Sequence, residues 1–205
     1  MPQINKNINK VGTGFAAFLS PPSPDVIRFT VGQPDFATPD AVVESAKSAL
    51  DRGETAYTRT QGSPDLCQAV SQHLKGHEID IDAQNIVVAP GCKQAVLYAM
   101  MATLDPGDEV LLLAPAWPSY DGMLKLIGAV PVHVPVRRDN YHPDFAALEK
   151  AVTPNTKAIM INSPNNPTGA VYTPEEIEKL VNLAVKHDLW IIDDMIYATL
   201  VWADY

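Results

Sequence analysis

The sequence has little cysteine and no long apolar run, and each shortage excludes a class of protein. Cys67 and Cys92 are its two cysteines, too few for a disulfide framework and in keeping with a reducing compartment. No stretch approaches the roughly 18 consecutive apolar residues of a membrane-spanning helix. Residues 1–10 are polar and rich in asparagine, without the apolar core of a secretory signal. The sequence therefore predicts a cytoplasmic protein that has no membrane partner.

Positive charge is scarce as well. The chain has 15 lysines and arginines against 24 aspartates and glutamates, a net charge of -9. This balance argues against a nucleic-acid partner, because non-specific binding to nucleic acid needs basic patches. Apolar residues make up 46% and charged residues 19%, which is typical of a globular protein and not of a disordered one. At 205 residues the chain is long enough to bury a sizeable core.

What the sequence does contain is a regular alternation of short apolar strands and amphipathic helices. Prolines interrupt the first residues, which are expected to form an extended arm with a possible strand at 26–31, followed by helices at 38–51 and 64–75. Strands are expected at 86–89, 110–114, 130–134, 158–161 and 189–192, with helices between them at 93–104, 119–127, 145–151 and 174–187. Thr173 and Glu176 have the spacing of a capping box that opens the last of these helices. The order of strands and helices predicts an α/β fold, a mostly parallel sheet with helices on both faces.

Ligands of such sheets bind outside the carboxyl ends of the strands, and the loops there carry suitable groups. Gly91, Cys92 and Lys93 lie between the expected strand 86–89 and its helix. A glycine lets the backbone approach a ligand, and the first free N–H groups of a helix favour a phosphate. A plain strand-to-helix turn is the alternative. Trp117, in the loop after the next strand, either stacks on a ligand ring or packs against the protein.

The loops after the last two strands supply an amide, a carboxylate and a phenol. Asn166 lies in a loop between Pro164 and Pro167, where its amide can bind a phenolate-like oxygen or form a local turn. Asp194 and Tyr197 follow the last strand. A buried carboxylate needs a cation or hydrogen-bond donors, and a protonated pyridine nitrogen would suit it; a surface turn is the alternative. For Asp193, next to it, the surface turn is preferred, and no metal is expected at Asp193 and Asp194, because no third ligand stands at metal-site spacing.

Along the chain these groups follow the order phosphate turn, stacking ring, amide, carboxylate and phenol. This order resembles that of the class I/II (fold-type I) pyridoxal-phosphate-dependent aminotransferases. The resemblance runs from about Val31 to Tyr205. It implies an aminotransferase-type domain at 38–205 that is truncated at its C-terminus, and an N-terminal arm and small-domain segment at 1–37. It also implies an enzyme that moves an amino group between an amino acid and a 2-oxo acid through pyridoxal phosphate.

The resemblance assigns a role to each of these residues. Backbone N–H groups of Cys92 and Lys93, after Gly91, would hold the cofactor phosphate, and Trp117 would stack on the ring. Asn166 and Tyr197 would bind the ring oxygen, and Asp194 would pair with the ring nitrogen. Gly32, in a segment similar to the family's Gly-x-Pro-Asp-Phe substrate loop, would line the substrate side. Tyr57 would reach the phosphate of the neighbouring subunit in a homodimer.

One element of the family pattern does not occur within the 205 residues. The family holds its cofactor as a Schiff base on a lysine some thirty or more residues beyond the Asp-x-x-Tyr motif, whereas the sequence ends eight residues after Tyr197. We therefore expect a truncated piece of a longer enzyme that is inactive alone and contains no catalytic residue of its own. The alternatives are a carbon–sulfur lyase or an aminocyclopropane-carboxylate-type synthase with the same cofactor, and a non-catalytic relative or partner subunit.

Overall fold

The computed structural model describes residues 6–8, 25, 27, 32 and 34–201. The chain divides into two compact units, Met1–Ala17 with Gly91–Tyr205, and Phe18–Pro90. The expected strand at 26–31 and most of the expected arm lie outside the described residues. The division of the chain after residue 37 stays a prediction.

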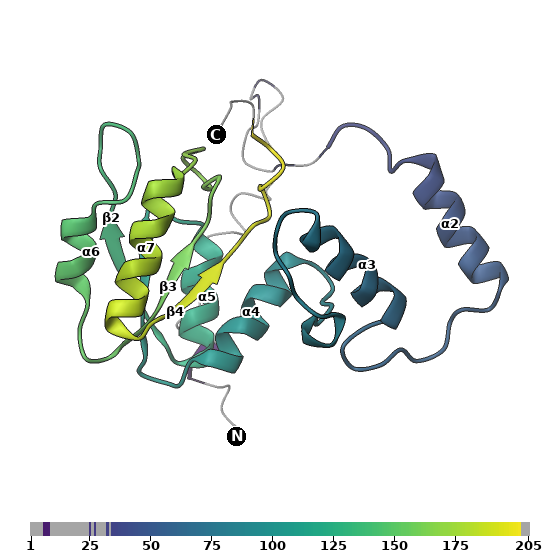
Figure 1. Cartoon of the computed structure of the whole chain (residues 1–205), viewed down its shortest axis with the longest axis horizontal. Coiled ribbons are helices and arrows are strands. Elements are labelled where there is room, and N and C mark those ends of the chain that lie inside the picture. The colour runs from purple at the N-terminus through teal and green to yellow at the C-terminus, as the bar shows by residue number, and fades with distance from the viewer. Residues whose placement is uncertain (1–5, 9–24, 26, 28–31, 33, 202–205) are drawn as a thin grey trace. The chain divides into compact units, whose positions relative to one another are not determined.

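The first unit is built on a sheet of parallel strands (Figure 1). The strands are β1 (Glu109–Ala114), β2 (Val130–Pro135), β3 (Thr156–Ile161) and β4 (Trp190–Asp193), in the order β2-β1-β3-β4. All three neighbouring pairs are parallel; Leu111, for example, lies opposite Val132 on one side and Ile159 on the other. The parallel α/β sheet expected from the sequence is confirmed. Because all strands run the same way, their carboxyl ends meet at one edge.

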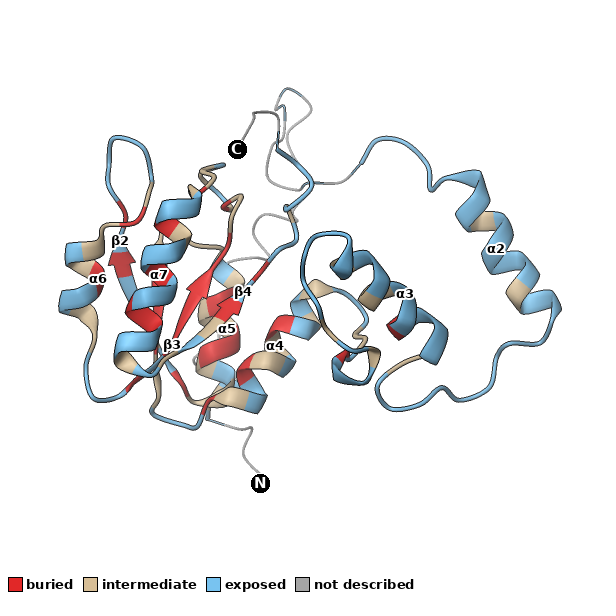
Figure 2. Ribbon diagram, in the orientation of Figure 1, coloured by how far each residue is buried: buried red, intermediate tan, exposed pale blue. Residues whose placement is uncertain are grey.

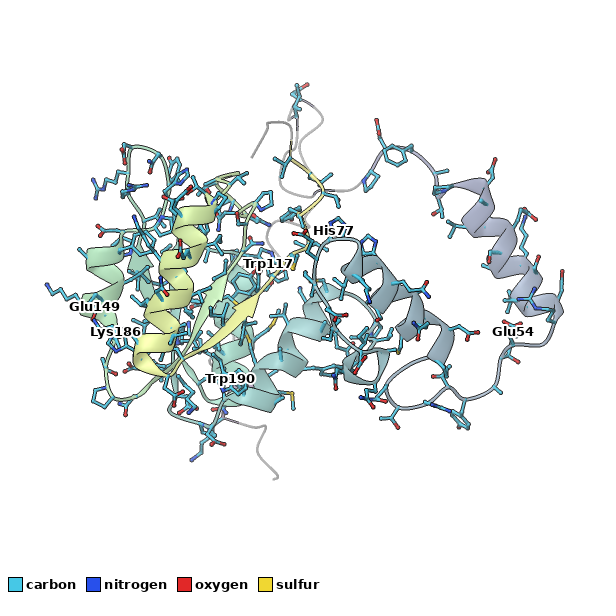
Figure 3. The ribbon with its side chains drawn as sticks, viewed as in Figure 1. Glu54, His77, Trp117, Glu149, Lys186 and Trp190 are labelled. Atoms are coloured by element: carbon cyan, nitrogen blue, oxygen red, sulfur yellow. The ribbon has the colours of Figure 1, made fainter. Side chains whose placement is uncertain are left out.

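Helices cover both faces of the sheet, as the alternation of buried side chains requires. On one face, Val110 and Leu112 of β1 pack with α4 (Cys92–Thr103) and α5 (Pro118–Ile127). On the other face, Leu111 and Leu113 pack with α6 (Phe145–Ala151) and α7 (Pro174–His187). The central strands β1 and β3 are therefore buried along most of their length, whereas the edge strands β2 and β4 and the outer faces of the helices keep exposed residues (Figure 2). Lys186 of α7 also forms an ion pair with Glu149 of α6 (Figure 3).

The expected strand at residues 86–89 is wrong. A short 3₁₀ helix, η2 (Ala83–Asn85), precedes this segment, which belongs to no sheet in the described part of the chain. The backbone of Ile86 is extended, but the N–H of Val88 donates to the carbonyl of Gln61, in a turn, at 2.8 Å. An apolar extended segment becomes a strand only when another strand offers it a ladder of hydrogen bonds. None of β1–β4 does so here.

The second unit contains two helices, both close to their expected bounds. The first, α2 (Asp40–Asp51), has no buried residue. The second, α3 (Pro64–Lys75), buries Cys67, whose thiol lies 3.9 Å from the carbonyl oxygen of Ile86. Among the described residues, no helix is both long and apolar enough to cross a membrane.

The start of α7 is held by a buried carboxylate. Glu176 and Thr173 form the expected capping box: the N–H of Thr173 donates to Glu176 Oε2 at 3.0 Å, and the N–H of Glu176 donates to Thr173 Oγ1 at 3.3 Å. Arg137 Nη2 and His142 Nδ1 lie 2.9 and 2.6 Å from the same carboxylate. Burial favours the protonated acid, but the hydrogen bonds of His142 and Thr173 and the charge of Arg137 outweigh it and lower the pKa of Glu176.

Glu176 therefore makes folding depend on pH. Because its pKa is lower in the folded chain, its contribution is present above the unfolded value, about 4.3, and is lost as pH falls through the folded value. We expect Glu176→Gln, which keeps a side chain suited to the capping box, to lower the free energy of unfolding at pH 7 by about 1–3 kcal/mol. Below pH 3 the variant and the parent should converge. Urea unfolding at several pH values measures both effects. Glu178→Gln, on an exposed position of α7, is the control and should change little.

Candidate functional site

The side chain at the centre of the site is the carboxylate of Asp194, directly after β4. Asp194 is only 4% exposed. Its Oδ1 accepts hydrogen bonds from the thiol of Cys92 (3.3 Å) and the N–H of Ile196 (3.2 Å), and its Oδ2 accepts one from the hydroxyl of Tyr120 (2.7 Å). Its own N–H donates to the carbonyl of Ile161, at the end of β3. The backbone thus holds the carboxylate at the sheet edge, and neutral donors offset part of the cost of burying it.

The loop after β3 places an amide beside a phenol. Asn162, 5% exposed, donates from Nδ2 to the carbonyl of Asp194 at 2.8 Å and accepts at Oδ1 from the N–H of Asn166, also at 2.8 Å. This arrangement ties the loops after β3 and β4 together. The side chain of Asn166 then reaches Tyr197, with 3.3 Å between Nδ2 and the hydroxyl oxygen. An amide donor and a phenol therefore converge on the same side of the sheet edge as Asp194.

Aromatic rings gather at the start of α5. Trp117 is the residue before this helix and lies edge-on to Tyr120, with ring centroids 5.3 Å apart and an angle of 84° between the planes. Lys93 Nζ lies 5.0 Å from the centroid of the Trp117 ring. Trp117 is half-buried. A small hollow adjoins these rings at the ends of β1 and β3, lined by Leu112, Leu113, Ala116, Tyr120, Met160, Asn162, Asn165 and Tyr172.

Gly91 begins α4 in a conformation that suits glycine alone. Its φ of 99° and ψ of 153° are open to glycine and strained for any other residue. A Cβ built on Gly91 would meet no atom within 4 Å, so the space beside this residue is open. The N–H groups of Cys92 and Lys93 belong to this first turn, where no intrahelical acceptor exists. The turn can therefore bind an anion.

Burial and the neighbouring carboxylate of Asp194 together keep two groups of the site protonated. Burial raises the pKa of Cys92 to about 11, and the hydrogen bond to Asp194 and the charge of Asp194 add to this effect. Burial, followed by the same hydrogen bond and charge, raises the pKa of Tyr120 far above its ordinary value. Both groups keep their protons at neutral pH and act as donors to the carboxylate.

The structure brings together most, though not all, of the residues expected from the sequence. Gly91, Cys92, Lys93, Trp117, Asn166, Asp194 and Tyr197 all belong to the first unit. Gly32 and Tyr57 belong to the second unit, where both are exposed, and their expected roles stay predictions. Asp193 is exposed, in line with the surface position preferred for it. Within the described ranges, no group of three or more histidine, cysteine, aspartate or glutamate side chains could hold a metal ion.

Sequence reasoning missed the side chains that hold Asp194. Tyr120 is 2% exposed and makes the shortest contact to the carboxylate. It stands three residues after Trp117, the spacing that places two side chains on one face of a helix, and this signal could have found it. The thiol of Cys92 and the amide of Asn162 were missed as well. No local pattern marks either of them, because their partners lie far away in the sequence.

Comparison with known proteins adds independent information. The model of the family Aminotransferase class I and II matches residues 24–205. An aspartate/prephenate aminotransferase of Thermus thermophilus is 41% identical over 180 residues, which cover 87% of the chain and 47% of that relative. An aspartate aminotransferase of Thermotoga maritima is 43% identical over 182 residues, covering 88% and 48%. The chain therefore spans about half the length of the curated relatives it matches.

Solved structures agree with the sequence matches. An alanine aminotransferase from Pyrococcus furiosus superposes with a TM-score of 0.91 at 29% identity, over 98% of the chain and 54% of that structure. An aspartate aminotransferase from Thermus thermophilus with maleate gives a TM-score of 0.87 at 35% identity, over 94% and 53%. Similarity in fold thus extends over nearly all of the chain and about half of each solved structure.

Proposed function

The chain belongs to the class I and II aminotransferases, and on that premise we propose that residues 91–201 form the cofactor-binding part of an enzyme that moves an amino group between an amino acid and a 2-oxo acid. Pyridoxal phosphate is the proposed cofactor. The observation that carries the proposal is the nearly buried carboxylate of Asp194, held by neutral donors beside an amide, a phenol and a helix N-terminus that is open at Gly91.

The residues present fit this cofactor. Open space beside Gly91 suits a phosphate, and a carboxylate with only neutral donors around it suits a cationic ring nitrogen. When bound, pyridoxal phosphate supplies an electron sink for negative charge on the amino acid carbon. The protein binds the cofactor, orients it and sets its charge.

Each proposed role follows from the chemistry of the side chain. Asp194 would keep the proton on the ring nitrogen, because an ion pair favours the charged form. The amide of Asn166 and the hydroxyl of Tyr197 would donate to the ring oxygen. The indole of Trp117 would cover one face of the ring and exclude water from it. The first-turn N–H groups of Cys92 and Lys93 would hold the phosphate.

Two further parts of the proposal concern the homodimer interface and the substrate side of the site. Tyr57 has a fully exposed side chain, which supports a role across a homodimer interface. Gly32, also exposed, is proposed to line the substrate side.

Pyridoxal phosphate titration, measured by absorbance, tests the proposal directly. The chain should bind pyridoxal phosphate more tightly than pyridoxal, which lacks the phosphate. Borohydride reduction followed by mass spectrometry then shows whether any lysine forms an adduct. Equal affinity for the two compounds, or no binding of either, would contradict the proposed site. Product analysis of the whole enzyme with an amino acid and a 2-oxo acid separates amino transfer from elimination or cyclisation.

Replacing Gly91 with alanine tests the phosphate position. The backbone of Gly91 is strained for any residue with a Cβ, so Gly91→Ala should distort the turn at a cost of about 1–3 kcal/mol. We expect roughly tenfold weaker binding of pyridoxal phosphate and little change for pyridoxal, because only the phosphate uses this turn. Gly107→Ala, at another positive-φ glycine with open space around it, is the matched control. Equal losses for both compounds in Gly91→Ala would place the phosphate elsewhere.

A further inference from the structure

We propose that Cys92 is a positioning residue whose thiol holds the carboxylate of Asp194 in place for the cofactor ring. The inference rests on the proposed function for its consequence, but the contact between the thiol and the carboxylate is testable without any cofactor. The side chain of Cys92 would then have a role of its own, besides the proposed binding of phosphate by the backbone N–H group.

The geometry leaves the carboxylate one free position. An ionised carboxylate has about four lone-pair sites. Cys92 and the N–H of Ile196 use Oδ1, at 3.3 and 3.2 Å, and Tyr120 uses Oδ2, at 2.7 Å. Three donors from three segments of the chain therefore fix the carboxylate and leave about one site for a cation. Without the thiol, Oδ1 would keep only the adjacent backbone N–H, a weaker restraint on rotation of the carboxylate.

The thiol acts as a donor because it stays protonated. A thiolate next to Asp194 would place two negative charges within 3.3 Å of each other in a largely buried place. The other titratable groups of this cluster are Tyr120 on α5, which interacts with both Cys92 and Tyr197, and Asp193, which interacts with Asp194. Lys93 is next to Cys92 on α4. The coupling is reciprocal: the carboxylate keeps the proton on the thiol, and the protonated thiol restrains the carboxylate.

Two substitutions of Cys92 distinguish hydrogen-bond donation by its thiol from the packing of its side chain. Cys92→Ser keeps a donor and Cys92→Ala removes it, while both keep the backbone N–H proposed to bind phosphate. We expect Cys92→Ala to bind pyridoxal phosphate about three- to fivefold more weakly, and Cys92→Ser to remain within about twofold of the parent. Equal losses in both variants would overturn a donor role.

Alkylation by iodoacetamide reports on the contact without the cofactor. The thiolate is the reacting form, so the rate at Cys92 follows its pKa. We expect Asp194→Asn to lower that pKa and to raise the alkylation rate at pH 9 about tenfold, which corresponds to a pKa lower by about one. Peptide mass spectrometry distinguishes Cys92 from Cys67. Asp193→Asn is the control, because Asp194 and not Asp193 accepts the hydrogen bond of the thiol. The pH profile of alkylation at Cys92 in this variant should stay close to that of the parent.

The two measurements separate the two proposals. Absence of pyridoxal phosphate binding in the parent chain would refute the proposed function, and the alkylation profiles would still decide the contact. Identical pH profiles for the parent and Asp194→Asn would refute the Cys92–Asp194 coupling, whatever the cofactor affinity. A shifted profile together with rescue by serine would support the positioning role.

Discussion

Replacing Asp194 with asparagine is expected to weaken pyridoxal phosphate binding by about 30-fold or more. The variant keeps the size and shape of the side chain but removes the charge that would face the ring nitrogen. Loss of one partner of a buried, hydrogen-bonded charge pair costs about 2–5 kcal/mol, and each 1.4 kcal/mol is a factor of ten in affinity. The dissociation constant is measured by equilibrium dialysis at pH 7.5, with far-ultraviolet circular dichroism to establish that the variant is folded.

Asp193→Asn is the matched control, because the two aspartates are adjacent and only one is buried. Its affinity should remain within about threefold of the parent, because Asp194 alone accepts the hydrogen bonds of Cys92 and Tyr120 and alone is proposed to face the ring nitrogen. If both variants lose pyridoxal phosphate affinity by the same factor, the affinity depends on the total negative charge near the end of β4 and not on the position of Asp194. If Asp194→Asn binds as the parent does, the cationic ring nitrogen lies elsewhere.

Replacing Leu112 with alanine should be the most damaging single change to the fold. Leu112 is 1% exposed in the middle of β1, between the sheet and the helices α4 and α5 that carry the site. Truncation of such a residue leaves a cavity and typically costs about 2–5 kcal/mol. Urea unfolding, monitored by circular dichroism, should therefore show a clearly lower midpoint.

Leu126→Ala provides the comparison for this prediction. Leu126 lies on α5 in the same unit, but 39% of it is exposed. Alanine there should cost about 1 kcal/mol or less, because little apolar contact is lost and alanine favours the helix. Similar losses at the two positions would mean that the layer between the sheet and α4–α5 is not the stabilising core that the burial of Leu112 indicates.

The elements of the first unit could be predicted from sequence because their signals are local. Thr173 and Glu176 stand within one helical turn, and their capping box identified the start of α7. Gly128, left-handed at the end of α5, likewise marks a helix end within a few residues. The alternation of strand and helix then predicted a parallel sheet, and the observed strands differ from expectation by at most two residues at any end.

The failure at residues 86–89 has a different origin. Ile86 and Val88 have the composition of a buried strand, yet a strand also needs a paired neighbour, and composition does not supply one. At the site, too, local features of the sequence were predicted and contacts between distant residues were not. Asp194 was found by its place after a strand, whereas Tyr120 and the thiol of Cys92 were not found to be its donors.

By itself, the sequence determined the class of fold, the order of its helices and strands from residue 92 to 193, and which loops carry polar groups at the sheet edge. These properties depend on hydrophobic periodicity and on caps that span only a few residues. Only the tertiary structure decided how Asp194 is held, because its contacts with Cys92 and Tyr120 join residues 102 and 74 positions apart. Such contacts depend on strand order and on the packing of α4 and α5 against one face of the sheet. No short stretch of sequence contains that information.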